Sequence, residues 1–67
     1  MYKIQFVMDS GKEHTLSRQV YGGSGPLDEI KASSQLSLAT EKLRYFTVDD
    51  GAIIFAEHIS EARIVND

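Results

Sequence analysis

The chain has 67 residues, a net charge of −3 at neutral pH and no cysteine. A domain of this length buries only about 60% of its unfolded surface, so we expect one small domain over residues 1–67 with a thin margin of stability. The missing thiols exclude disulfides and thiolate metal sites, and the acidic balance lowers the expectation of nucleic-acid or anionic-membrane binding.

The N-terminal residues alternate between polar and apolar types, with apolar side chains at Tyr2, Ile4, Phe6 and Met8. This period of two predicts a half-buried strand. The N-terminus lacks the apolar core of an export signal, and no later run approaches the roughly 20 apolar residues that span a bilayer. We therefore expect a cytoplasmic protein without membrane contact.

The segment 9–12, Asp-Ser-Gly-Lys, suits a tight turn whose glycine adopts the left-handed region. A hairpin partner should start near Glu13 and run to Val20. Only Leu16 and Val20 are apolar on one face of that run, so we expect an edge strand. Unpaired backbone groups on such an edge can accept a strand from another protein or, by self-association, from a second copy of this chain.

The glycine-rich segment 22–26 ends this strand, and a helix is predicted from Pro26, which fits a first helical turn. Leu27 and Ile30 would share its apolar stripe. Serines weaken the helix from its middle onward, so we expect it to end between Gln35 and Leu38.

The segment 36–43 fits both a helical and a strand period, and it is too short for periodicity to decide. A second helical turn or a loop is favoured there, with a strand as the alternative.

The segment 45–65 predicts a three-stranded antiparallel meander. Tyr45 and its neighbours are strand formers, and Asp49-Asp50-Gly51 supplies a structural turn. Because residues 53–55 are contiguous and apolar, they are predicted to form a central strand buried on both faces. Residues 63–65 close the chain as the last strand.

The predicted class is therefore α+β, in the order strand, strand, helix, strand, strand, strand. So many short strands with one helix favour a strongly bent antiparallel sheet. This is either an SH3-like or Sm-like small barrel or an open sheet with the helix across one face.

Four segments carry a resemblance: the hairpin 2–6 with its turn 9–12, and the closing segments 50–54 and 58–64. This pattern of strands resembles small uncharacterised proteins common in Gram-positive bacteria and their phages. It also looks like small flagellar proteins that open with a strand, a glycine turn and a strand. The resemblance implies a fold and a bacterial or prophage origin, and it carries over no site.

His14 and His58 are the two imidazoles, each preceded by a glutamate. A metal site would need both on one face with a third ligand such as Asp49 or Glu61, and two surface histidines are the favoured interpretation. We therefore predict no metal site.

The glycine-rich segment 22–25 before a helix is typical of a phosphate cradle, but no Lys-Ser or Lys-Thr pair follows it, so a flexible connection is favoured. Ser10, Ser17 and Ser24 have no positioned base in the sequence pattern. We predict no catalytic residue, no cofactor and no enzymatic activity.

The favoured function is a protein-interaction module, with a homodimer formed through an edge strand as one mode of association. Its predicted surface comprises Thr15, Ser17, Gln19, Arg44 and Tyr45. The alternative is a nucleic-acid-binding small barrel, in which Lys42 and Arg44 contact phosphate and either Tyr45 or Phe46 stacks on bases. Strand alternation predicts Arg44 and Tyr45 on opposite faces.

Overall fold

The computed structural model describes residues 1–66 and contains one α-helix and two antiparallel sheets. The elements in chain order are β1 (Tyr2–Met8), β2 (Glu13–Leu16), α1 (Glu29–Glu41), β3 (Tyr45–Thr47), β4 (Ile53–Phe55), the short 3-10 turn η1 (Ala56–His58) and β5 (Ile59–Asn66). The first sheet has the order β2-β1-β5, and the second pairs β3 with β4. The α+β class and the predicted order of elements are confirmed.

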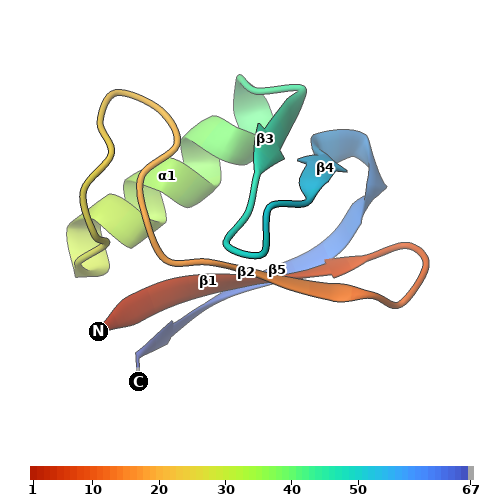
Figure 1. Cartoon of the computed structure of the whole chain (residues 1–67), viewed down its shortest axis with the longest axis horizontal. Helices are drawn as coiled ribbons and strands as arrows, with labels where there is room; N and C mark the ends of the chain where they lie inside the picture. Colours follow the sequence, from red (N-terminus) through yellow and green to blue (C-terminus); the bar gives the residue numbers. More distant parts are fainter. Residues whose placement is uncertain (67) are drawn as a thin grey trace.

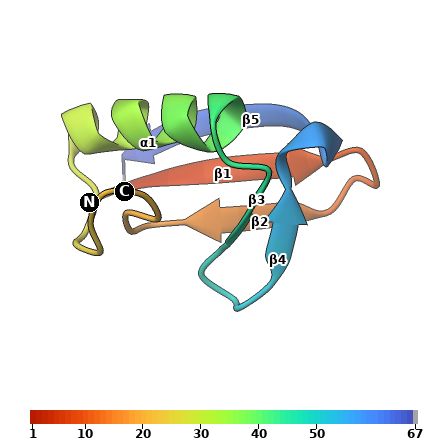
Figure 2. The same cartoon turned by 90° about the horizontal axis from the view of Figure 1, so that it is seen from above.

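The helix and the β3–β4 ribbon lie on the same side of the three-stranded sheet (Figure 1), and the helix runs along it (Figure 2). One backbone hydrogen bond, from the Asp49 N–H to the Thr15 carbonyl at 2.9 Å, links the turn of the ribbon to β2. No strand ladder joins the two sheets within residues 1–66. Of the two predicted arrangements, the structure has the open sheet covered on one face.

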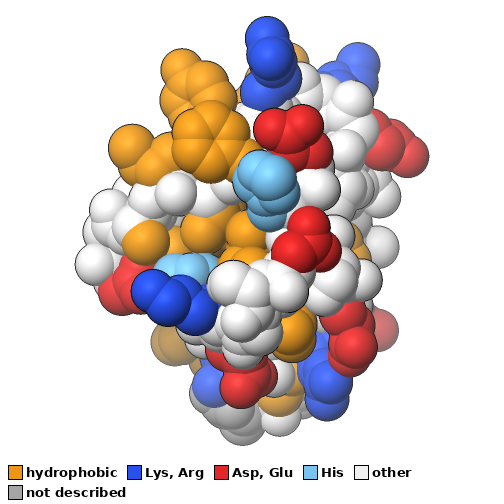
Figure 3. All heavy atoms as spheres, turned by 90° about the vertical axis from the view of Figure 1, so that its right-hand side faces the viewer, with side chains coloured by type: hydrophobic (Ala, Val, Ile, Leu, Met, Phe, Trp, Pro, Cys, Tyr) orange, Lys and Arg blue, Asp and Glu red, His pale blue; other side chains and the backbone are white. Residues whose placement is uncertain are grey.

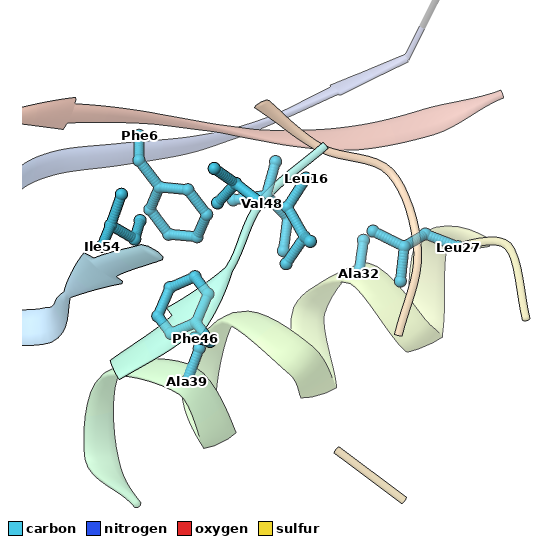
Figure 4. Close-up of a cluster of buried hydrophobic side chains, with 9 residues drawn as sticks. Phe6, Leu16, Leu27, Ala32, Ala39, Phe46, Val48 and Ile54 are labelled. Carbon is cyan, nitrogen blue, oxygen red and sulfur yellow. The ribbon is translucent and has the colours of Figure 1, made fainter. Parts of the chain in front are cut away.

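The core fills the space between the sheet, the helix and the ribbon (Figure 4). Phe6 of β1 packs against Phe46 of β3, with ring centroids 5.3 Å apart. Every layer contributes to the buried hydrophobic cluster of Ile4, Phe6, Leu16, Leu27, Ala32, Ala39, Phe46, Val48 and Ile54.

The β1–β2 hairpin forms as predicted, with Ile4 opposite Leu16. Gly11 has a φ of 88° in the turn, a left-handed conformation that glycine adopts without steric cost. β2 is an edge strand, as expected, although it ends at Leu16 and not at Val20.

The helix begins later than predicted because Asp28 is its N-cap. The Asp28 side chain accepts a hydrogen bond from the Lys31 N–H at 2.7 Å, so α1 starts at Glu29 and not at Pro26. Ile30 was predicted to lie on the apolar stripe, and it is 81% exposed.

The helix also ends later than predicted, at Glu41, which makes most of the segment 36–43 helical. Ser33, Ser34 and Ser37 are exposed, so their hydroxyls remain in water and impose no burial cost on the helix. Intrinsic propensity alone therefore underestimated its length.

The C-terminal half departs most from the prediction. β4 pairs only with β3, and β5 pairs with β1, so the segment 45–65 is not a three-stranded meander. The prediction of a central strand at residues 53–55 is also wrong: Ile53 is 58% exposed and Phe55 is 48% exposed. A run of apolar residues predicted burial on both faces, whereas the core covers only one face of this two-stranded ribbon.

One polar side chain, Gln35, is buried beside the core. Its Oε1 accepts hydrogen bonds from the Val20 and Tyr21 N–H groups at 2.9 and 3.1 Å, and its Nε2 donates to the Tyr21 carbonyl at 2.8 Å. These three bonds fasten the loop after β2 to α1. Sequence reasoning missed this role, because a glutamine in a polar helix gives no signal of burial.

We predict that Gln35→Ala lowers the free energy of unfolding by about 1–3 kcal/mol, because three part-buried hydrogen bonds to the backbone of Val20 and Tyr21 are lost. Urea unfolding followed by circular dichroism measures the change. Ser34→Ala, an exposed change on the same helix, should stay within about 0.5 kcal/mol of the parent chain. Equal losses in the two variants would contradict the role of Gln35.

Candidate interaction surface

The outer face of the β3–β4 ribbon is apolar. Phe46 and Ile54 point into the core, so alternation turns Tyr45, Ile53 and Phe55 outward. The rings of Tyr45 and Phe55 lie across from each other with centroids 5.7 Å apart. Full burial of one large apolar side chain is worth about 1.5–3 kcal/mol, so this face offers substantial binding energy to a partner.

A hollow of about 460 Å³ borders this face where α1 ends and β3 begins. Arg44 and Glu57 give it opposite charges, and two rings give it an apolar wall. The complete lining is Thr40, Arg44, Tyr45, Phe55, Ala56 and Glu57.

A second hollow, of about 370 Å³, lies between β4 and the β1–β2 turn. All three residues of β4 line it, although neighbouring strand residues point to opposite faces. The hollow therefore runs beside the strand, along the edge that is not paired with β3. Its lining is Met8, Asp9, Ser10, Lys12, His14, Ile53, Ile54, Phe55 and His58. Figure 3 shows hydrophobic side chains gathered near the histidines on this side of the molecule.

The edge of β4 presents unpaired backbone groups to this second hollow. The Val48 N–H donates a hydrogen bond to the Ala52 carbonyl, so these two residues form a bonded pair. Bonded pairs alternate with non-bonded pairs along an antiparallel ladder, so the next bonded pair is Phe46 with Ile54, and Ile54 bonds toward β3. The N–H and C=O of Ile53 and the N–H of Phe55 therefore face away from β3. Within residues 1–66 these three groups make no hydrogen bond.

Both histidines line the second hollow. His14 Nδ1 lies 3.3 Å from Asp50 Oδ2, and His58 Nδ1 lies 3.6 Å from Asp9 Oδ2. Residues 1–66 hold no group of three or more His, Asp or Glu side chains that could bind a metal ion. The two imidazoles therefore share a hollow without the third ligand that a metal site would need.

Asp49 fastens the turn of the ribbon to the outer edge of β2. Its carboxylate accepts hydrogen bonds from the Ser17 N–H at 3.0 Å and from the Ser17 hydroxyl at 2.8 Å, while its own N–H donates to the Thr15 carbonyl. An added strand would need these same outward groups of Thr15 and Ser17. The chain itself therefore occupies part of the edge that the sequence predicted as a docking site.

Asp50 closes the same turn, and its Oδ1 accepts a hydrogen bond from the Ala52 N–H at 2.9 Å. This backbone donor, with a smaller contribution from His14, lowers the pKa of the Asp50 carboxyl from its ordinary value of 3.8, and partial desolvation opposes the shift. Gly51 follows with a φ of 86°. The Asp-Asp-Gly sequence is therefore a structural turn.

The five residues predicted as an interaction surface fall into two groups. Thr15, Ser17 and Gln19 are half-buried and hydrogen-bonded within the chain, and they line neither hollow. Arg44 and Tyr45 are exposed and line the first hollow together. Arg44 precedes the strand, so alternation does not separate it from Tyr45.

Two further residues belong to the predicted nucleic-acid surface. Phe46 is only 5% exposed and packs in the core, which leaves Tyr45 as the accessible ring. Lys42 is exposed at the C-cap of α1, where its backbone N–H donates to the Leu38 carbonyl at 2.9 Å.

The glycine-rich segment 22–25 is separated from the start of α1 by Pro26, Leu27 and Asp28. The Asp28 carboxylate already accepts a hydrogen bond from the first turn and would repel a bound anion. The segment therefore lacks the geometry of a phosphate cradle.

Sequence reasoning missed Ile53 and Phe55 as surface residues. A usable signal was present: the Asp-Asp-Gly turn predicts a hairpin, and its register places Phe55 opposite Tyr45. In this register Phe46 and Ile54 share one face, and their burial in the core implies that Tyr45 and Phe55 on the other face are exposed.

A scan of protein-family models and searches of curated proteins and solved structures found no match to this chain. Within residues 1–66, no helix is long and apolar enough to cross a membrane. Functional inference therefore starts from the ribbon and its two hollows.

We predict that Asp50→Asn lowers the thermal stability at neutral pH and has little effect well below pH 4. The pKa of Asp50 is lower in the folded state than in the unfolded state, where it is near 3.8. The ionised carboxylate therefore stabilises the fold at pH values above 3.8, and this stabilisation is lost as the pH falls through the lower pKa of the folded state. Thermal unfolding at neutral and acid pH measures the difference. Glu13→Gln, at an exposed carboxylate, is the control; an Asp50→Asn deficit that persists in acid would contradict the assignment.

Proposed function

We propose that this chain is a non-enzymatic protein-interaction module that binds an extended peptide segment along the edge of β4. The observation that carries the proposal is the second hollow, which is lined by all three β4 residues and lies beside the unpaired backbone groups of Ile53 and Phe55. A peptide in an extended conformation has the matching alternation of N–H and C=O groups.

Backbone pairing would supply direction and register, while side chains would supply most of the affinity. A net hydrogen bond contributes only about 0.5–1.5 kcal/mol, less than the burial of one large apolar side chain. Phe55 lines both hollows, so a bound segment can contact this ring from either side. Met8 and Ile54 form an apolar part of the second hollow. We therefore expect ligands with β-branched or aromatic residues.

The proposal moves the docking edge from β2 to β4. Asp49 occupies the outward carbonyl of Thr15 and the outward N–H of Ser17, whereas Ile53 retains both of its outward groups. Protein binding remains the expected mode of action, but the binding edge is formed by Ile53 and Phe55 of β4 and not by Thr15 and Ser17.

The absence of enzymatic activity is part of the proposal. His14 and His58 line a hollow, which a catalytic site would require, but each imidazole has a carboxylate near its Nδ1. In the part of the chain that the structure describes, no serine is hydrogen-bonded to either imidazole. Nucleophilic catalysis needs a nucleophile within hydrogen-bonding reach of its base. A cytoplasmic location, and the bacterial or prophage origin that the resemblance implies, remain predictions.

A second candidate function, nucleic-acid binding, is favoured by one observation: Arg44 and Tyr45 line the same hollow. A cation beside an accessible ring suits a single-stranded base and its phosphate. Glu57 lines that hollow as well, and the chain carries a net charge of −3, so the electrostatic contribution to binding is poor.

A displayed library of random linear peptides tests peptide binding. We expect enriched sequences with short runs of strand-forming residues, and at least about a tenfold loss of their affinity in Ile53→Pro, which removes an outward N–H but no ladder bond. Thr47→Pro is the matched control, because Thr47 lies opposite Ile53 in the register and faces the other edge of the ribbon.

Circular dichroism checks that both proline variants fold, and Phe55→Ser provides a second test that leaves the backbone unchanged. Peptides that bind Ile53→Pro and Phe55→Ser as tightly as the parent chain would exclude the β4 edge. A library without enriched sequences would also contradict the proposal.

Titration of labelled single-stranded RNA and DNA at low salt separates the two candidates. The peptide-binding proposal predicts no complex at micromolar protein. A salt-sensitive complex that is lost in Arg44→Ala and Tyr45→Ala would favour the nucleic-acid function instead.

A further inference from the structure

The strand β5 forms the border of the three-stranded sheet opposite β2 (Figure 2). Ladder alternation identifies the backbone groups that it leaves unpaired. The Met8 N–H donates a hydrogen bond to the Lys12 carbonyl, so Met8 bonds toward β2. The Thr15 carbonyl instead accepts from the Asp49 N–H and points away from β1, so its partner in the register, Gln5, does not bond toward β2. Because bonded and non-bonded pairs alternate along an antiparallel ladder, the even-numbered residues of β1 bond toward β2. The odd-numbered residues of β1 therefore bond toward β5.

The register pairs Gln5 with Arg63 and Val7 with Glu61, so these two β5 residues bond toward β1. The N–H and C=O groups of Ala62 and Ile64 consequently point outward. No hydrogen bond within residues 1–66 reaches these outward groups. A border strand with unpaired groups is a template for another strand.

The side chains of β5 restrict which strand can pair there. Glu61 and Arg63 flank Ala62, are both exposed, and lie on the same face, where Arg63 Nη2 donates to Glu61 Oε1 at 2.7 Å. Antiparallel pairing of this strand with itself, centred on Ala62, would place Glu61 of each copy opposite Arg63 of the other.

We propose that β5 pairs antiparallel with β5 of a second copy of this chain, with a twofold axis at Ala62. The pairing extends each three-stranded sheet into one continuous six-stranded sheet. Ala62 would exchange hydrogen bonds with its counterpart in the second copy, in agreement with the outward direction of its backbone groups. Two charge pairs, symmetric about the axis, replace the single intrastrand pair of each monomer.

Neighbouring registers are unfavourable for this pairing. In any register of this pairing, residues whose backbone groups point away from β1 must lie opposite each other, because only these residues can form the new hydrogen bonds. The two nearest registers that meet this condition place the twofold axis at Glu61 or at Arg63. Like charges would then lie directly opposite each other, which destabilises a strand pair. The charges therefore favour the Ala62-centred alignment over both of its neighbours, and a second copy is the partner that the sequence of β5 itself complements.

Side-chain burial supports a partner on this border. Ile64 is 37% exposed although its neighbour across the ladder, Ile4, is fully buried. A paired β5 would cover Ile64 at the margin of the core. This interface uses neither β4 nor the two hollows, so it is independent of the proposed peptide binding.

Charge reversal combined with sedimentation equilibrium tests the pairing. The parent chain of 7.5 kDa should sediment at twice this mass with rising concentration. Glu61→Arg and Arg63→Glu should each raise the dimer dissociation constant about tenfold or more, because each places like charges opposite each other. The double variant, which exchanges the two charges, should restore the parent affinity to within about threefold.

Mixing provides a second readout. Glu61→Arg and Arg63→Glu should each be monomeric at a concentration where an equimolar mixture forms a heterodimer, since their charges are complementary. Circular dichroism checks the fold of each variant, and both positions are exposed. A parent chain that stays monomeric to millimolar concentration would overturn the proposal. So would a dimer that single charge reversals leave intact, or one that the double variant fails to restore.

Discussion

The packing of Phe46 against Phe6 is the contact on which the rest of the structure depends. It places the inner face of the β3–β4 ribbon over the sheet, where Val48 and Ile54 complete the core. Strand alternation then turns the remaining large side chains of the ribbon outward, and no second layer built from residues 1–66 covers them. The exposed rings are thus a direct consequence of how so short a chain builds its core.

The short chain also leaves strand edges with unpaired backbone groups. Asp49 occupies outward backbone groups of β2, and this border is consequently a poor template for a further strand. Within residues 1–66, the borders at β4 and β5 have no such contact. We infer different partners for them, because β4 lies beside an apolar hollow while β5 carries a self-complementary pair of charges.

Much of the fold was accessible from sequence, because local signals and tertiary packing agree in the N-terminal half. The alternation of residues 2–8 and the glycine turn predicted the first hairpin correctly. The later strands were harder to place, since residues 53–55 are apolar throughout and their burial depends on what covers them. The partner of β5 is distant in the chain, and no local pattern identifies it. For the interaction surface, Arg44 and Tyr45 were identifiable as exposed strand-end residues, whereas the open edge at Ile53 required the observed pairing.

Amide hydrogen exchange at single-residue resolution tests most directly the claim that β4 is paired with β3 on one side and open on the other. In the free protein, the Ile54 amide should be protected by its bond toward β3, while the Ile53 and Phe55 amides should exchange at nearly unprotected rates. Comparable protection at Ile53 and Ile54 would contradict the account, because it would mean that the β4 edge is already paired in the free chain.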